Sequence, residues 1–273
     1  MIYYYANTGH KLGLERLRRG VALLNTLTSH GEETQLLVND FRAGLVARDL
    51  GVDSYVTIET VQDIDAIAEV GNSIIIDSVE KDQGRLVKFC ADFENVWRFA
   101  LDDNDTALHS EIVIDKNTIF VDDRYFENKP KVEKILFFLG DADYDKVILN
   151  NAAFFNSFDM ELLLGNYFFV KYEDDLAKLF STLHEPEAHE DLITTSNTIV
   201  TASMQTALEA KASGAYVIYL HILKDTMYDL SFIESKGITI INGFNKEKLS
   251  EFLKNGTSDT LQHIEKIEDK IFL

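Results

Sequence analysis

The residue types that handle protons or bind phosphate are concentrated in two short stretches of this 273-residue chain. Residues 7–13 form a polar turn after an apolar run, and His10 stands there between two glycines, Gly9 and Gly13. Residues 201–210 also follow an apolar run and are rich in small polar side chains. After a strand, such residues let backbone N–H groups approach an anion, and the N-terminus of the next helix attracts negative charge. Both stretches are therefore candidate ligand-binding turns.

The first stretch leads into a segment with three arginines, Arg16, Arg18 and Arg19, which could bind a phosphate or a sugar. It contains neither the GxGxxG fingerprint of dinucleotide-binding folds nor the glycine–lysine signature of a P-loop. The alternative interpretation is an ordinary strand–helix turn beside an arginine-rich, solvated helix face.

In the second stretch, backbone N–H groups and hydroxyls could surround a phosphate. The residues at these positions are Ser203, Met204, Gln205 and Thr206. Glu209 follows one helical turn later, where a carboxylate can accept hydrogen bonds from two vicinal ribose hydroxyls. The stretch therefore predicts a nucleotide site, and the alternative is a capped helix with a surface glutamate.

These turns must be positioned by strands and helices, and short apolar runs do alternate with amphipathic segments along the chain. Residues 74–76 are all isoleucine, apolar on both faces, as in parallel sheets covered by helices. We therefore predict an α/β fold with doubly wound parallel sheets. Strands are predicted over residues 2–6, 34–38, 55–58, 73–77, 95–101, 111–115, 135–139, 160–164, 168–170, 198–201, 216–220 and 238–241, and helices over residues 14–28, 40–50 and 258–273.

A polar stretch at residues 126–131, containing one of the two prolines, interrupts this alternation. We place a domain boundary there, which divides the chain into residues 1–128 and residues 129–273. The alternation restarts after it, so the second half is predicted to be another α/β domain.

The composition restricts the partners and the compartment. Lys and Arg number 26 against 46 Asp and Glu, a formal charge of −20, whereas nucleic acids and anionic membranes need a basic face. We expect no nucleic-acid partner. No apolar run reaches the roughly 18 residues of a membrane span, and no secretory signal is visible at the start. The single cysteine, Cys90, excludes an intrachain disulfide and a Cys-rich zinc site, so a reducing cytoplasm is the expected compartment.

The segment from Ser203 onward resembles the nucleotide-binding segment of GT-B glycosyltransferases and their relatives. Thr206, Glu209, Ala210 and Gly214 occupy the places of that pattern, with Ser203 where glycine is usual. Within the GT-B proteins the sequence is most similar to the UDP-sugar hydrolases of pseudaminic acid biosynthesis, which act on UDP-2,4-diacetamido-2,4,6-trideoxy-β-L-altropyranose.

Other segments of that family have counterparts here in the same order. They are the strand that ends at Asp77, the strand that ends at Asp102 and Asp103, residues 110–117, and residues 134–143 with Gly140 in their turn. The resemblance implies two Rossmann-like domains that face each other across a cleft, residues 1–128 on the sugar or acceptor side and residues 129–273 on the nucleotide side. The last helix would pack back on the first domain.

The resemblance also implies a reaction, in which water attacks the anomeric carbon of a UDP-sugar and UDP leaves. No metal and no redox cofactor is needed, and the partner is the UDP-sugar itself. Substrate- or phosphate-binding roles are implied for Gly13, Arg16, Arg19 and Asp103, and a nucleotide-binding role for Gly140.

The sequence departs from the family at its catalytic histidine, because Arg16 stands at that position. Arginine stays protonated and cannot serve as a base. His10 and Asp77 are the catalytic residues that we select instead, with Glu15 as a further candidate, while His189 falls in a polar stretch and is predicted to lie at the surface. A glycosyltransferase, or a GT-B relative that binds a nucleotide sugar or a partner without turnover, stays an open alternative.

Overall fold

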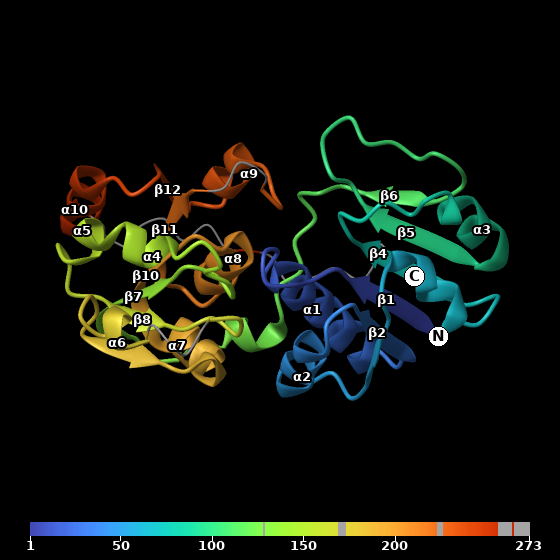
Figure 1. The fold of residues 1–273 in the computed structure, drawn as a ribbon, viewed down its shortest axis with the longest axis horizontal. Helices are drawn as coiled ribbons and strands as arrows, with labels where there is room; N and C mark the ends of the chain where they lie inside the picture. The colour runs from blue at the N-terminus through green and yellow to red at the C-terminus, as the bar shows by residue number, and fades with distance from the viewer. Residues whose placement is uncertain (128, 169–172, 223–225, 256–263, 265–273) are drawn as a thin grey trace. The chain divides into compact units, whose positions relative to one another are not determined.

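The computed structural model describes residues 1–127, 129–168, 173–222, 226–255 and residue 264. The chain divides into two compact units, and the described residues from Met1 to Asp122 form the first and those from Asp123 to Ile264 the second. Each unit contains one sheet with helices around it, as Figure 1 shows. No helix in the described part of the chain is long and apolar enough to cross a membrane.

The first unit is built on a six-stranded sheet in which neighbouring strands are parallel and run in the order β3-β2-β1-β4-β5-β6. This is the strand order of doubly wound nucleotide-binding folds. Its elements are β1 (Ile2–Ala6), α1 (Glu15–Ser29), β2 (Thr34–Val38), α2 (Phe41–Asp49), β3 (Tyr55–Thr57), η1 (Val61–Ala66), β4 (Ser73–Asp77), α3 (Arg85–Asp92), β5 (Asn95–Phe99) and β6 (Ile112–Ile114).

The centre of this sheet is buried on both faces. All five residues of β1 and all five of β4 are buried, as their apolar sequences predict. Helix α1 lies directly on β1 at Gly20, where an added Cβ atom would collide with the ring of Tyr4. Glycine at this position therefore sets the close approach of α1 to the strand whose end carries the candidate turn.

The second unit repeats the same topology. Its parallel sheet has the order β12-β11-β10-β7-β8-β9, which becomes the order of the first sheet when the strands are renumbered from β7 and read from the other edge. Its elements are η2 (Asp123–Phe126), β7 (Val132–Phe138), α4 (Val147–Asn150), α5 (Ala152–Phe155), β8 (Glu161–Leu163), α6 (Glu173–Leu176), β9 (Thr182–His184), η4 (Pro186–Ala188), α7 (His189–Thr195), β10 (Ser196–Thr201), α8 (Met204–Ala212), β11 (Tyr216–His221), α9 (Leu230–Ser235), β12 (Thr239–Asn242) and α10 (Lys246–Asn255).

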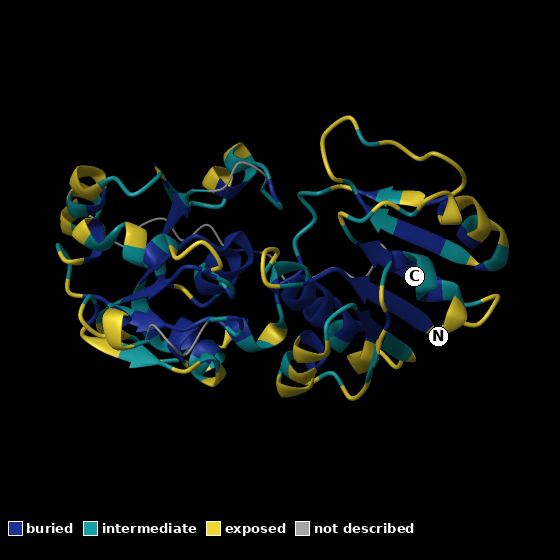
Figure 2. Cartoon of the chain, in the orientation of Figure 1, coloured by how far each residue is buried: buried dark blue, intermediate teal, exposed yellow. Residues whose placement is uncertain are grey.

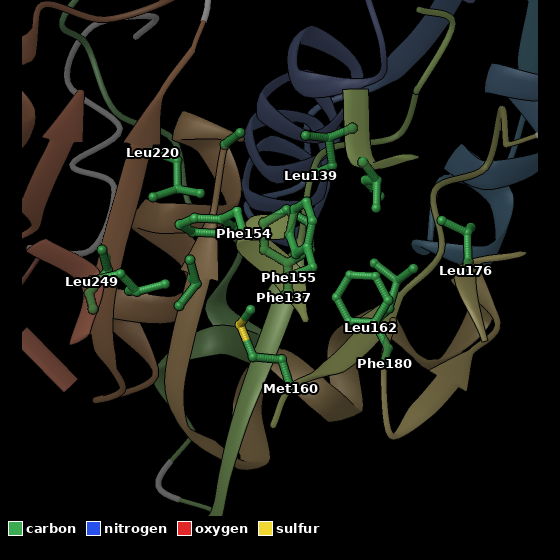
Figure 3. Packing of buried hydrophobic residues seen from close by; sticks show 14 of the residues in the cluster. Phe137, Leu139, Phe154, Phe155, Met160, Leu162, Leu176, Phe180, Leu220 and Leu249 are labelled. Atoms are coloured by element: carbon green, nitrogen blue, oxygen red, sulfur yellow. The ribbon is translucent and has the colours of Figure 1, made fainter. Parts of the chain in front are cut away.

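Aromatic residues fill the core on one face of this second sheet. The ring centroid of Phe137, on β7, lies 4.8 Å from that of Phe155 and 5.9 Å from that of Phe180 (Figure 3). Phe154 packs edge-on against Phe155 at 5.1 Å. These side chains are buried together with the central strands, whereas exposed residues gather on loops and outer helix faces (Figure 2). The phenylalanine pairs therefore serve packing, not base stacking.

The predicted α/β fold class is confirmed, with two parallel sheets. The strands predicted at residues 2–6, 34–38 and 73–77 have the observed bounds. Strand β9 was not predicted, because its three residues are too few and too polar to show a pattern. The predicted strand at 168–170 and the predicted helix at 258–273 fall outside the described residues, apart from Phe168 and the buried Ile264.

Candidate ligand-binding sites

In each sheet the strand order reverses between two neighbouring strands, β1 and β4 in the first unit and β7 and β10 in the second. In open α/β sheets, ligands bind at the carboxyl ends of the strands at this point of reversal. The turn after β1 begins at Asn7, whose N–H donates to the carbonyl of Asp77 at 3.0 Å. The turn after β10 begins at Ala202, whose N–H donates to the carbonyl of Phe138 at 3.1 Å. Both stretches singled out in the sequence thus lie at the expected edge.

Asp77, the last residue of β4, is the buried anion at the edge of the first unit. Arg19 donates two hydrogen bonds to it, with Nη2–Oδ1 of 2.7 Å and Nε–Oδ2 of 3.0 Å. The hydroxyl of Tyr4 donates to Oδ2 at 2.7 Å, and the Arg19 guanidinium lies 3.6 Å above the ring of Phe99. Both carboxylate oxygens are occupied and the side chain is 2% exposed. These surroundings do not suit the predicted role of Asp77 as an accessible base and favour a positioning role.

Arg16 approaches the same carboxylate from the first turn of α1. Its Nε atom lies 3.3 Å from Oδ1 of Asp77, and its side chain is 18% exposed. The edge of the first unit therefore brings three of the predicted residues together, Arg16, Arg19 and Asp77. Among the residues that the structure describes, two guanidinium groups thus share the one carboxylate of Asp77.

The turn that carries His10 is fixed at its base and open at its tip. The N–H of Thr8 donates to Oδ1 of Asn39 at 2.7 Å, and Nδ2 of Asn39 donates back to the carbonyl of Thr8 at 3.0 Å. Gly13 has a left-handed backbone, with φ of 70°, and its N–H donates to the carbonyl of Gly9 at 2.8 Å. His10 is exposed at the tip, while Asp77 is buried, so the two predicted catalytic residues stand in opposite environments.

Asp103 lies away from this cluster, on the loop after β5. Its side chain is 74% exposed and its Oδ1 atom is 3.6 Å from Nζ of Lys116. An exposed, salt-bridged aspartate of this kind is an ordinary surface group. Its predicted contact with substrate has no support in its present surroundings.

In the second unit, Ser203 caps α8. Its Oγ atom accepts a hydrogen bond from the N–H of Thr206 at 3.1 Å, and its own N–H donates to Oγ1 of Thr201 at 3.0 Å. The N–H groups of Met204 and Gln205 belong to the first turn, which has no acceptors within the helix. The turn is therefore rich in N–H donors at the edge where ligands bind, as an anion site requires.

Glu209 is buried rather than exposed, contrary to the alternative of a surface glutamate. It is 2% exposed, and its Oε1 atom accepts a hydrogen bond from Nε2 of Gln205 at 3.3 Å. Tyr228 in turn donates to Oε1 of Gln205 at 2.9 Å. The Oε2 atom of Glu209 lies 3.8 Å from Nε2 of His189. A buried carboxylate is thus held one helical turn beyond the N–H-rich turn.

His189 joins this network and was missed by the sequence analysis. It is 4% exposed, so the prediction of a surface position is wrong. Its Nε2 atom is 3.4 Å from Oγ1 of Thr206, and its Nδ1 atom is 3.3 Å from the hydroxyl of Tyr125. Its ring packs edge-on against Phe138 at 5.2 Å. The residues that bury it come from η2 and β7, so the polar sequence around His189 does not indicate that this histidine is buried.

The acidic turn at Gly140 uses its carboxylates for local structure. Asp143 accepts hydrogen bonds from the N–H groups of Val147 and Ile148, at 2.5 and 3.4 Å, and burial raises its pKa above the ordinary aspartate range. Asp141 accepts from Nδ2 of Asn166 at 2.9 Å. Because two buried acidic side chains disfavour a neighbouring phosphate, this turn is less suited to an anion than the start of α8.

Neither a protein-family model nor a curated protein matches this sequence. Solved structures with the same fold span nearly the whole chain. A spinosyn rhamnosyltransferase complexed with spinosyn aglycone is similar with a TM-score of 0.59 at 11% identity, covering 93% of this chain and 91% of its own. A putative UDP-N-acetylglucosamine 2-epimerase from Listeria monocytogenes gives 0.58 at 13% identity, covering 93% and 88%.

The UDP-GlcNAc 2-epimerase of Methanocaldococcus jannaschii, in complex with UDP-GlcNAc and UDP, gives a TM-score of 0.56 at 12% identity and covers 95% of this chain and 94% of its own. At such identities the likeness establishes the fold. Two six-stranded parallel sheets of identical topology, matched along their length by these enzymes, show that the chain has the GT-B fold.

Proposed function

We propose that this protein binds a UDP-sugar and hydrolyses it, with UDP held by the second unit and the sugar by the first. The observation that carries the proposal is the start of α8, where a Ser203-capped turn of N–H donors is followed by the buried Glu209. The structures with the same fold include a UDP-GlcNAc 2-epimerase in complex with UDP-GlcNAc and UDP. That likeness supports a nucleotide sugar as the ligand, whereas the reaction is argued from the side chains of this protein.

In this proposal the diphosphate lies against the N–H groups at Met204 and Gln205 and the helix start stabilises its charge. The ribose hydroxyls donate to Glu209. Because Glu209 is 2% exposed and bonded to Gln205, ribose binding requires its carboxylate to exchange that amide for ligand hydroxyls. Gly140, in the acidic turn, would border this site without contacting phosphate through a side chain.

Hydrolysis needs a group that takes the proton of the attacking water while the bond from the anomeric carbon to the UDP oxygen breaks. Imidazole is the side chain best suited to this near neutral pH. We assign the base to His10, because it is exposed at the ligand edge of the first unit and Asp77 is covered by Arg19 and Tyr4. The N–H donors and the helix start at α8 would stabilise the leaving group.

The test is UDP release from a panel of UDP-sugars by the parent protein and by His10→Asn. We expect the variant to lose about 10²- to 10⁴-fold in kcat, the usual worth of general base catalysis, with UDP affinity unchanged. His109→Asn, which changes another exposed histidine of the first unit, is the matched control and should keep the parent rate. Full activity in the His10 variant would exclude His10 as the base.

A second candidate is nucleotide-sugar binding without turnover. It is favoured by Arg16 at the place of the family histidine and by the covered carboxylate of Asp77. UDP binding by the parent, with no release of UDP from any sugar, would establish this candidate. Release that depends on an added acceptor would instead identify a glycosyltransferase.

A further inference from the structure

Arg16 uses only a small part of the hydrogen-bonding capacity of its side chain. A guanidinium carries five N–H donors. Within the described part of the chain, its one polar contact is the 3.3 Å approach of Nε to Asp77, and Nε is buried there without a hydrogen-bond acceptor. The side chain is 18% exposed, so its terminal Nη groups can be reached from solvent. Arg16 is therefore a donor held beside Asp77 whose outer part is open to a ligand.

The charge of the cluster points to an anionic ligand. Arg19 already matches Asp77 with two hydrogen bonds, and Tyr4 adds a third to the same carboxylate. Arg16 is thus a second cation beside one anion, and a part-buried charge without its own counter-charge is costly. The chain has 46 acidic residues, yet none of the described ones forms an ion pair with Arg16 besides Asp77.

The position of Arg16 makes the ligand a substrate group rather than a chance ion. The side chain starts in the first turn of α1 and reaches Asp77 at the carboxyl end of β4, so the guanidinium lies at the reversal of strand order. Asn7, at the same edge, presents a buried Oδ1 atom that has no hydrogen-bond partner in the described structure. Such an edge is where an α/β unit binds its ligand.

We infer that Arg16 binds a carboxylate on the sugar, so that the substrate class is an acidic sugar nucleotide such as a UDP-uronate. The inference rests on the proposed function, in which the first unit holds the sugar and the second holds UDP. The planar guanidinium group can donate two parallel hydrogen bonds to the two oxygens of a carboxylate. A neutral sugar would not require a positive charge at position 16, whereas an acidic sugar would.

The experiment is calorimetric titration of the full chain with UDP, UDP-glucose and UDP-glucuronate, the last two differing only in a hydroxymethyl group against a carboxylate at C6. We expect the parent to bind UDP-glucuronate roughly 10- to 100-fold more tightly than UDP-glucose, the value of a charged hydrogen-bond pair. Arg16→Gln should abolish this preference and leave UDP affinity unchanged. Arg16→Lys, which keeps the charge and loses the fork, should retain part of it.

Arg48→Gln is the control, because it removes one positive charge from an exposed position in the last turn of α2 in the same unit, and it should keep the full preference. Equal affinity of the parent for the two sugars would overturn the inference while leaving the proposed function intact. A loss of UDP affinity itself in Arg16→Gln would also overturn it, since Arg16 would then contact the diphosphate. Absence of any UDP binding by the parent would overturn the proposed function and this inference with it.

Discussion

Asp77→Asn removes one charge from an ion pair whose side chains are 3% and 2% exposed. The variant removes the charge of the carboxylate that accepts two hydrogen bonds from the buried Arg19, so we expect the free energy of unfolding of the first unit to fall by about 3–5 kcal/mol. The single tryptophan, Trp97 on β5, lies in this unit, and its fluorescence during urea unfolding measures the change. Asp175→Asn, in the exposed pair with Lys178, should leave stability nearly unchanged. An equally small change in stability for Asp77→Asn would show that the Arg19–Asp77 ion pair does not stabilise the first unit.

Glu209→Gln tests the ribose assignment with little change of shape. The amide keeps the size of the side chain but loses the charge that would accept two hydroxyls, so we expect UDP binding to weaken by about 1–3 kcal/mol. Calorimetric titration measures this, and Glu251→Gln on α10 is the control for an exposed glutamate. Unchanged affinity in the Glu209 variant would mean that the nucleotide binds elsewhere.

Single residues were predicted unevenly for a physical reason. The turn of His10 and the start of α8 stand out as candidates because their residue types follow apolar runs in the sequence. The burial of His189 was not, because Tyr125 and Phe138 contact it from segments more than fifty positions away. The partners of Asp77 were missed likewise: an aspartate that ends a strand looks the same in sequence whether it faces a ligand or Arg19.

At the scale of elements, Asp143 ties the start of α4 to the turn after β7 and makes stability depend on pH. Its pKa is raised by burial, so the folded protein holds this proton more tightly than the unfolded chain does. Its contribution to stability is therefore present below the ordinary aspartate pKa and is lost as the pH rises through the raised value.

Asp143→Asn removes this titration and keeps an acceptor for the helix N–H groups. The free energy of unfolding of the variant, relative to the parent, should therefore rise as the pH increases from about 3 to about 7. Urea unfolding of the variant and the parent across that range measures the difference. A relative stability of Asp143→Asn that falls with pH would reverse the assigned direction.

Elements at the centre of each sheet were predicted best. Strand β4 is apolar on both faces because helices cover both sides, and this leaves an unmistakable run of isoleucines. Strand β9 lies at an edge, where one side of the ladder is unpaired and polar residues are tolerated, so its sequence resembles a loop. The alternation of apolar runs and amphipathic segments predicts which residues form strands. The order of the strands in the sheet depends on the connections between them, which the local sequence does not reveal.

At the scale of the whole molecule, the two units share one topology although no short repeat is visible in the sequence. What they share is alternation of strand and helix, parallel pairing of neighbouring strands, and a reversal of order at the centre of the sheet. Each reversal carries a different set of groups, arginines and a histidine in the first unit and N–H donors with a carboxylate in the second. A common fold thus carries two chemically different candidate sites.

The net charge of −20 gives the last prediction, which concerns salt. A negative protein repels the UDP anion over long distances, while the donors that bind it act at short range. Raising the ionic strength from about 0.01 to 0.15 M shortens the Debye length from about 30 to 8 Å, which screens the repulsion more than the contacts. UDP affinity should therefore increase by a few-fold, opposite to the weakening that salt causes for basic phosphate-binding proteins. Calorimetric titrations at both ionic strengths measure this, with uncharged uridine as the ligand whose affinity should not change. A steady loss of UDP affinity with added salt would mean that positive groups close to the bound UDP outweigh the field of the whole chain.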